Sequence, residues 1–250
     1  PSRQLQVRNL AWQADTVYRQ QRPLYFYDLK NRDKQAGSTH DQRKRVKPGL
    51  IFARFGKMES LNGKEALPEF RKAYGALLDE MIKLTPRVVV VSPTPFFAKG
   101  PAAALTEERN IVLAAYCLAM SELAQERGLH FANFNQLEPN RPYSENGVHL
   151  NSAGQAETAK RLIQQLNDQG PETEFEGPKV EKLRQAVIVK NYVWHQYHRP
   201  TNWAFLYGDR QHVPSSRDHE DGEKRWFPFE LERALNLIEK QEAKIYELAK

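Results

Sequence analysis

Short apolar runs alternate with segments of helical periodicity over residues 1–166. The continuous run Arg87–Ser92 (RVVVVS) is typical of a strand covered on both faces, whereas the segment from Leu67 repeats apolar residues at helical spacing. The predicted strands are Leu5–Leu10, Pro48–Phe55, Arg87–Ser92 and His130–Phe134, and the predicted helices are Leu67–Leu84, Asn110–Gln125 and Ser152–Leu166. This alternation predicts an α/β parallel sheet, which binds ligands at the carboxyl ends of its strands.

The pattern changes after residue 166. Residues 167–180 are rich in Gly, Pro and acidic side chains and are predicted to be a linker. Residues 181–250 contain many Trp, Tyr and His without clear periodicity, and they end in a predicted helix, Leu231–Leu248. We therefore expect an α/β domain over 1–166, the linker, and a C-terminal arm over 181–250. The arm is expected to pack back on the core and to bury its aromatics without regular structure.

The composition indicates a globular protein and argues against a membrane-spanning or nucleic-acid-binding one. The chain has 250 residues, 40% hydrophobic and 27% charged, which suits one globular domain with an appendage. No apolar run approaches the roughly 18 residues that a membrane span needs. The most basic stretch, Arg32–Lys47, is predicted to be a solvated loop, although its clustered Lys and Arg could instead contact phosphate or an acidic partner. It lacks the interleaved aromatics of a nucleic-acid-binding segment.

The single cysteine, Cys117, lies in the apolar segment IVLAAYCLAM and is predicted to be a buried small hydrophobe. One cysteine builds neither a disulfide nor a thiolate metal site. We expect no metal and no cofactor.

Four motifs follow one another in a fixed order: RNLAWQADT, FGKMES, VVVVSPTPFF and ENGVHLN. This order resembles the SGNH/GDSL hydrolase family, and most closely its planctomycete-type domains, which also carry an RP-N stretch matched here by Arg199, Pro200 and Asn202. The resemblance implies a flavodoxin-like parallel sheet and serine ester hydrolysis, with a carbohydrate ester or another small ester as substrate. It also implies an extracytoplasmic location.

The resemblance assigns roles to four residues. His149 occupies the position of the catalytic base, and Asn146 occupies the position of the Asp that orients this base. Ala14 and Met58 stand where the family places the Gly and Asn of the oxyanion hole. The Met58 side chain has no N–H, and losing one such donor typically costs about 10²–10³ in rate. An Asp-to-Asn change in a serine protease triad costs about 10⁴. These departures predict a catalytically impaired member.

A nucleophile is not evident in these residues, because no GDS-type stretch precedes the first predicted strand. Ser60 follows Glu59 in the FGKMES motif and is the hydroxyl expected to lie nearest the pocket. Ser92 and Thr94 lie at the end of the predicted strand Arg87–Ser92. Each of these hydroxyls could equally be a loop or cap group. Glu59 could orient His149 in place of Asn146, or could be an ordinary loop carboxylate.

The other histidines and aromatic residues each allow a structural and a functional interpretation. A metal site from His149, His130 and Glu59 lacks a supporting spacing. His195 and His198 are interpreted as packing residues. Three aromatic side chains are either a sugar-stacking surface, if exposed, or buried anchors of the arm: Trp194, Tyr197 and Trp203.

The resemblance also implies a strand between Leu5–Leu10 and Pro48–Phe55 in the sheet, and these residues supply none. Because unpaired strands inside a fold are costly, we expect an upstream segment or a partner chain to supply it. Three functions stay open: a binding or assembly module, a serine esterase of the carbohydrate deacetylase type whose serine lies upstream, and a structural subunit of a larger complex.

Overall fold

The computed structural model describes residues 5–12, 15–20, 39–101, 103–166, 177–198, 200, 203–206 and 209–250. The chain forms two compact units. Unit 1 contains Pro1–Gln13, Gln21–Val46 and Glu174–Lys250, and unit 2 contains Ala14–Gln20 and Lys47–Thr173.

Unit 2 is built on a parallel sheet in the order β1-β2-β3. Its strands are β1 (Ile51–Arg54), β2 (Val88–Val91) and β3 (His130–Ala132). Ala53 pairs with Val90, which in turn pairs with Phe131. The predicted parallel α/β architecture is confirmed. Among the described residues β1 pairs with β2 alone, so a further strand beside β1 stays a prediction.

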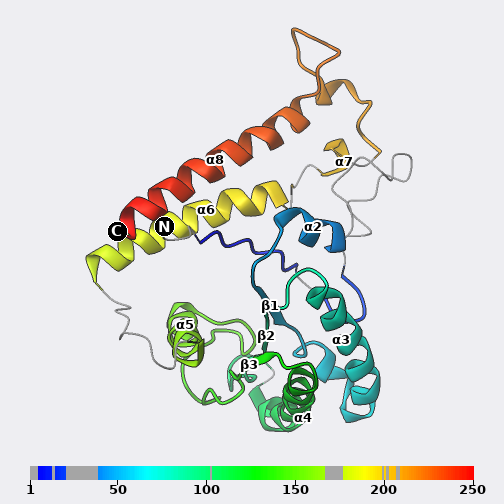
Figure 1. The fold of residues 1–250 in the computed structure, drawn as a ribbon, viewed down its shortest axis with the longest axis vertical. Helices are drawn as coiled ribbons and strands as arrows, with labels where there is room; N and C mark the ends of the chain where they lie inside the picture. Colours follow the sequence, from blue (N-terminus) through cyan, green and yellow to red (C-terminus); the bar gives the residue numbers. More distant parts are fainter. Residues whose placement is uncertain are drawn as a thin grey trace. The chain divides into compact units, whose positions relative to one another are not determined.

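Three long helices cover this sheet, and they match the predicted ones (Figure 1). They are α3 (Leu67–Ile82), α4 (Thr106–Glu126) and α5 (Ser152–Leu166), and short 3-10 turns lie at η1 (Glu59–Asn62), η2 (Lys64–Ala66) and η3 (Ala103–Leu105). Val88 and Val90 belong to the core cluster with α3 and α4, while Val89 and Val91 belong to a cluster that Leu162 of α5 contacts. Alternate residues of β2 therefore face opposite helical layers, which explains why the whole strand is apolar.

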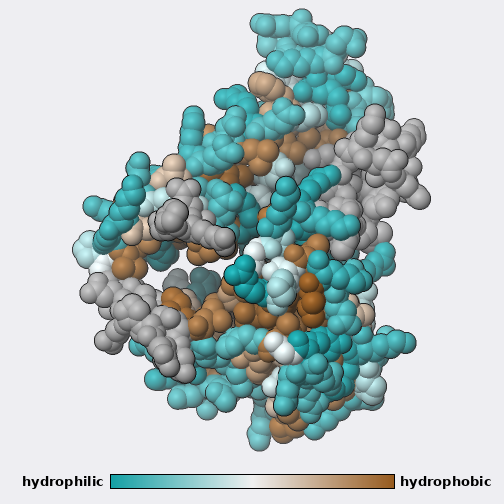
Figure 2. All heavy atoms as spheres, viewed as in Figure 1, coloured by the Kyte–Doolittle hydropathy of each residue, from teal (hydrophilic) through white to brown (hydrophobic). Residues whose placement is uncertain are grey.

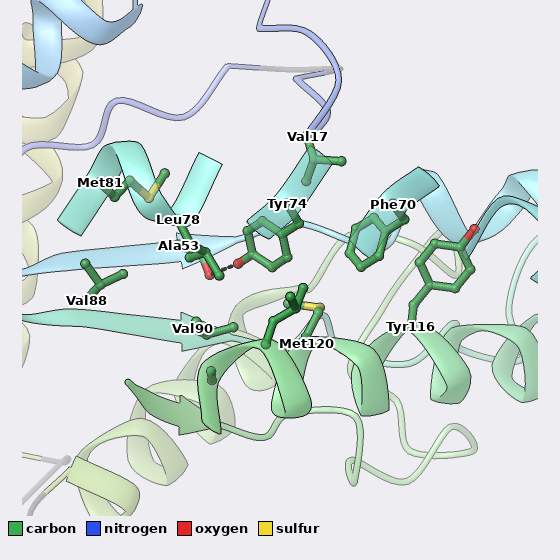
Figure 3. Close-up of a cluster of buried hydrophobic side chains, with 12 residues drawn as sticks. Val17, Ala53, Phe70, Tyr74, Leu78, Met81, Val88, Val90, Tyr116 and Met120 are labelled. Atoms are coloured by element: carbon green, nitrogen blue, oxygen red, sulfur yellow. Dashed lines mark hydrogen bonds between the residues drawn. The ribbon is translucent and has the colours of Figure 1, made fainter. Parts of the chain in front are cut away.

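Aromatic side chains fill the core between the sheet, α3 and α4 (Figure 3). Tyr74 is fully buried, and its hydroxyl donates to the carbonyl of Ala53 over 3.0 Å. Burial raises the pKa of Tyr74, so its phenol stays a neutral donor. Phe70 packs between two tyrosines, with ring centroids 5.5 Å from Tyr74 and 4.8 Å from Tyr116. Tyr74 thus joins α3 to the backbone of β1.

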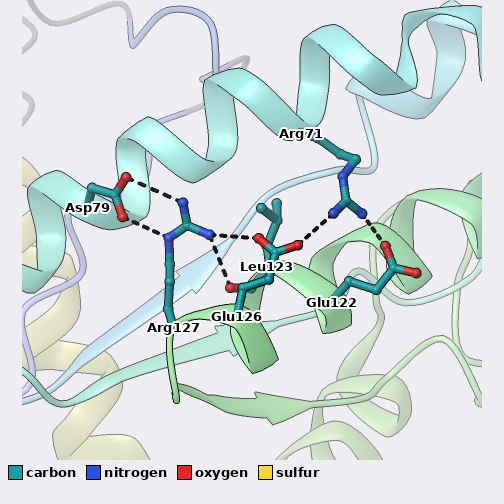
Figure 4. A network of polar contacts seen from close by, with 6 residues as sticks. All are labelled: Arg71, Asp79, Glu122, Leu123, Glu126 and Arg127. Atoms are coloured by element: carbon teal, nitrogen blue, oxygen red, sulfur yellow. Dashed lines mark hydrogen bonds and ion pairs between the residues drawn. The ribbon is translucent and has the colours of Figure 1, made fainter.

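A polar network spans the outer surface of α3 and α4 (Figure 4). Arg127 Nε lies 2.7 Å from Asp79 Oδ1, and this hydrogen bond holds the pKa of Asp79 below its usual range. Arg71 pairs with Glu122 and Glu126. Exposed pairs of this kind contribute only about 0–1 kcal/mol each, so the aromatic core, and not this network, determines how the two helices pack.

Unit 1 contains a pair of long antiparallel helices, α6 (Pro178–His198) and α8 (Trp226–Leu248) (Figure 1). Its shorter helices are α2 (Thr39–Val46), α7 (Trp203–Leu206) and the 3-10 turn η4 (Pro214–Ser216). The predicted helix Leu231–Leu248 is confirmed within α8. The prediction that the rest of the arm lacks regular structure is wrong, and α6 begins inside the predicted linker. The buried residues of α6 recur every fourth position: Ala186, Lys190, Trp194 and His198. Two of the four are polar or charged, which hides the helical period from a reading based on hydrophobicity.

Two further predictions of local structure are wrong. Leu5–Leu10 is not a strand. Its backbone carbonyls accept hydrogen bonds from side chains of unit 1 instead: Val7 from Lys190 Nζ (2.9 Å) and Asn9 from Trp194 Nε1 (2.7 Å). The basic stretch Arg32–Lys47 was expected to be a loop, but its part from residue 39 forms α2, and residues 32–38 lie outside the described residues.

The surface of the helix pair in unit 1 carries apolar side chains (Figure 2). Brown, hydrophobic surface runs along α6 and α8 between teal, hydrophilic side chains. Ile188 and Val189 of α6 are about half exposed, as is Leu237 of α8. Within the described part of the chain, no helix is both long enough and apolar enough to cross a bilayer.

Candidate functional site

Three loops meet at the carboxyl ends of β1 and β2 in unit 2. They are residues 55–60, which follow β1, residues 92–97, which follow β2, and residues 144–150, which precede α5. Lys57 Nζ donates to the carbonyl of Pro95 over 3.0 Å and to that of Val148 over 3.1 Å, and so joins all three. The motifs FGKMES, SPTPFF and ENGVH therefore lie together, as expected for a parallel sheet.

The loop that carries His149 is held by its own polar side chains. Asn146 Oδ1 accepts from the backbone N–H of Val148 (3.0 Å) and of His149 (2.9 Å). Ser144 Oγ accepts from the Gly147 amide (2.9 Å) and donates to the His149 carbonyl (2.6 Å). Gly147 has φ 83°, and a Cβ there would lie 2.5 Å from the carbonyl oxygen of Lys99. Only glycine fits this turn.

The helix after this loop begins as predicted. Asn151 Oδ1 accepts from the Gly154 amide over 3.0 Å, so Asn151 caps α5. Asn151 also donates from Nδ2 to the Pro142 carbonyl over 2.9 Å. This cap keeps the ENGVH loop at a constant position relative to α5.

His149 is exposed, and its Nδ1 lies 2.9 Å from Asn146 Nδ2. Because Asn146 Oδ1 already accepts from two backbone amides, the NH₂ group of Asn146 faces the imidazole and donates to it. Nδ1 is then the acceptor, and the proton of the neutral ring stays on Nε2. A serine hydrolase needs the opposite tautomer, with a proton on Nδ1 and a lone pair on Nε2.

Glu59 is fully buried, and both of its oxygens accept hydrogen bonds from backbone amides. Oε1 accepts from Val17 over 2.8 Å, and Oε2 accepts from Gly56 over 2.9 Å. Glu59 therefore joins the residues around Val17 to the loop after β1. The described partner of the His149 Nδ1 atom is Asn146, and the contacts of Glu59 are those of a structural carboxylate.

The candidate hydroxyls are buried, and those of Ser60 and Ser92 are bound within the fold. Ser60 Oγ donates to the Lys57 carbonyl over 2.8 Å. Ser92 Oγ accepts from the Phe134 amide over 2.7 Å and lies 3.2 Å from Asn133 Oδ1. Thr94 is 1% exposed. These contacts are structural, and none of them brings a hydroxyl to His149.

Of the two expected oxyanion-hole positions, the structure describes Met58 and not Ala14. Met58 is 49% exposed and precedes η1. Ala14 lies outside the described residues, as do Arg199, Asn202 and the side chain of Trp203. Their expected roles stay predictions.

The aromatic and histidine cluster of unit 1 is an internal one. Trp194 is buried, and its ring stacks on His198 with centroids 5.2 Å apart and an interplanar angle of 11°. Tyr197 lies 5.6 Å from Trp194. His195, in contrast, is exposed on α6. Trp194 and His198 are therefore buried packing residues of unit 1, and no sugar-stacking surface includes Trp194.

Cys117 is buried as predicted, and burial raises the pKa of its thiol to about 12. His130 begins β3. Among the described residues, His, Cys, Asp and Glu side chains do not gather in groups of three or more that could hold a metal ion.

Lys57 is the site residue that the sequence analysis missed. Its ammonium lies 4.8 Å from the centroid of the Phe96 ring. Burial, and next the positive charge of Arg54, lower the pKa of Lys57 to about 7. The available signal was a single lysine within a motif at the end of an apolar strand, between Gly56 and Met58.

Comparisons with known proteins identify a family and one similar solved structure. The model of the GDSL-like Lipase/Acylhydrolase family matches residues 4–157, which is more than half of the chain. Among solved structures, a mutant of an acetyl-xylooligosaccharide esterase from Geobacillus Stearmophilus is similar, with 17% sequence identity and a TM-score of 0.42. The match covers 64% of this chain and 71% of that chain. No curated protein matches the chain.

The contacts of Glu59 predict a loss of stability in Glu59→Gln. A glutamine side chain has one acceptor and one donor group, so it cannot accept from both the Val17 and Gly56 amides. We expect the free energy of unfolding, measured with urea, to fall by about 1–3 kcal/mol. The exposed Glu69→Gln on α3 is the matched control and should change it by less than about 0.5 kcal/mol. Equal stability of the two variants would contradict the structural role of Glu59.

The contact between Asn146 and His149 predicts the tautomer of His149. At about pH 8, ¹⁵N NMR of the ring should show the proton on Nε2. Asn146→Asp replaces the donating NH₂ with an accepting oxygen, so the tautomer equilibrium should shift toward Nδ1–H by at least about tenfold. The exposed Asn140→Asp should leave it unchanged. A wild-type ring protonated on Nδ1 would show that the amide is oriented the other way.

Proposed function

We propose that this chain, which belongs to the GDSL-like lipase/acylhydrolase family, is a catalytically impaired member that serves as a binding or assembly module. Membership of this family is consistent with the parallel sheet of unit 2 and with a site at the carboxyl ends of its strands.

One observation carries the proposal: Asn146 donates a hydrogen bond to Nδ1 of His149. General-base catalysis creates an imidazolium, which carries a proton on Nδ1 as well as on Nε2. That proton would point at the NH₂ group of Asn146, so the pair opposes the charged state that the reaction requires. An Asp at this position would stabilise the same state.

Two more features support impairment. Met58 offers no side-chain donor to a developing oxyanion, and its side chain is half exposed. The hydroxyls of Ser60 and Ser92 are already bound inside the fold. The described residues therefore keep the loop architecture of a serine hydrolase while their donors and acceptors serve the fold.

The alternative is a serine esterase of the carbohydrate deacetylase type, whose nucleophile lies outside these residues. The exposure of His149 at the carboxyl end of the sheet favours it, because an active base must be accessible to substrate. In that case Asn146 would be a weak orienting group, and the reaction would be slow.

A serine-directed fluorophosphonate probe, applied to the intact protein with p-nitrophenyl acetate hydrolysis as a second readout, separates the two. For an impaired module we expect no labelling and no hydrolysis above background, in the wild type and in His149→Ala alike. Labelling that His149→Ala abolishes, and that the exposed His219→Ala leaves intact, would overturn the proposal. Asn146→Asp should then raise the hydrolysis rate, by up to about 10⁴.

A second candidate is a structural subunit that associates through unit 1. Ile188 and Val189 on α6 are 45% and 46% exposed, and Leu237 on α8 is 50% exposed. Apolar residues gathered on one helix pair commonly mark an interaction surface. The partner that we propose is a second copy of this chain.

Sedimentation velocity tests this second candidate. The wild type should sediment as a dimer, and Val189→Glu should sediment as a monomer, because a buried unpaired charge opposes association by several kcal/mol. The control Leu118→Glu changes an exposed leucine of unit 2 and should leave the dimer intact. A wild type that stays monomeric at all concentrations tested would rule the candidate out.

A further inference from the structure

Two cations converge on one hydroxyl beside the candidate site. Arg54 ends β1, and its Nη2 atom lies 3.4 Å from Thr94 Oγ1. Lys57 follows β1 in the next loop, and its Nζ atom lies 3.5 Å from the same oxygen. Both distances are long for hydrogen bonds, so the hydroxyl separates the two charges without binding either of them tightly.

No carboxylate neutralises this pair among the described residues. The polar partners of Lys57 are the carbonyls of Pro95 and Val148 and the hydroxyl of Thr94, and the hydrogen-bond partner of Arg54 is Thr94. The other groups that affect the charge of Lys57 are Arg54 from β1 and Cys117 from α4, and the Cys117 thiol is protonated. Clustered positive charge beside low-dielectric walls attracts anions.

Thr94 supplies a further donor. It is 1% exposed, and its oxygen faces Arg54 and Lys57, which are donors only. Its own O–H has no acceptor among the described residues. Arg54 is exposed and has donors beyond the one that faces Thr94. A buried hydroxyl proton, a guanidinium and an ammonium thus lie together, and no carboxylate among the described residues accepts from any of them.

We propose that Arg54, Lys57 and Thr94 form a binding site for an oxyanion group, a carboxylate, sulfate or phosphate, on a small ligand. The guanidinium presents a planar fork that matches two oxygens of such a group. The ammonium neutralises its charge, and the Thr94 hydroxyl donates to a third position. The site lies at the carboxyl ends of β1 and β2, where ligands of parallel sheets bind.

The site also adjoins the ENGVH loop, because Lys57 donates to the carbonyl of Val148, the residue before His149. A ligand anchored there by its anion would extend along this loop. The inference goes beyond the proposed function, since the anion site does not depend on whether His149 assists hydrolysis.

Binding should depend on pH through Lys57. Its pKa in the unliganded protein is about 7, so its ammonium form is lost as pH rises through neutrality. An anion binds this form preferentially, so binding should take up protons above pH 7. Affinity for sulfate, which keeps its charge throughout, should fall about tenfold from pH 6 to pH 8.

Titration of sodium sulfate, sodium phosphate and sodium acetate into the ¹⁵N-labelled whole chain, at constant ionic strength, tests the proposal. We expect saturable shifts of the Thr94 and Val148 amides with at least one of the three salts. The salt with the highest affinity distinguishes a tetrahedral anion from a carboxylate. The absence of saturable shifts with all three salts would overturn the proposal.

Variants test the residues. Lys57→Met and Arg54→Gln should each weaken anion binding by about tenfold or more. Lys57→Arg should bind sulfate with the same affinity at pH 6 and at pH 8. The exposed Lys72→Met and Arg87→Gln are matched controls and should bind as the wild type does. Because Arg54 is exposed, Arg54→Gln keeps the test decisive even if Lys57→Met fails to fold. Undiminished binding in Arg54→Gln, or equal weakening in the controls, would overturn the assignment.

Discussion

The buried carboxylate of Glu59 is the constraint on which the loop after β1 depends. A carboxylate removed from water is very costly unless it is hydrogen-bonded, and Glu59 meets that requirement with the amides of Val17 and Gly56. These two bonds determine the path of the chain between β1 and α3. Lys57 lies within that path, so the reach of its side chain to Pro95 and Val148 follows from the Glu59 contacts.

The ENGVH loop shows that loop geometry and catalytic polarity are separable. An oxygen of residue 146 accepts from the amides of Val148 and His149, and an Asp could do the same. The two residue types differ at the second terminal atom, where Asn146 presents an NH₂ group to the imidazole. The shape of this loop is therefore compatible with either residue type, whereas the group that faces the imidazole differs: an Asp oxygen would stabilise an imidazolium, and the NH₂ group of Asn146 opposes it.

Two positively charged side chains lie at the same edge of the sheet. Arg54 and Lys57 face the hydroxyl of Thr94, and the partners of both cations are neutral oxygens. Burial, and next the positive charge of Arg54, lower the pKa of Lys57 to about 7, so keeping both charges here costs free energy in the unliganded protein. An anionic ligand would offset that cost. The proposed binding function and the proposed anion site therefore involve the same region of unit 2.

The sequence by itself determined the parallel α/β unit, because the all-apolar run of β2 is typical of a strand covered on both faces and the spacing from Leu67 is typical of a helix. Tertiary structure alone decided three things. The carbonyls of Leu5–Leu10 accept hydrogen bonds from side chains of α6 and α8, so this segment is no strand. The buried face of α6 includes Lys190 and His198, so its helical period is invisible to hydrophobicity. The convergence of Arg54 and Lys57 on Thr94 depends on contacts between residues far apart in sequence, which no local pattern encodes.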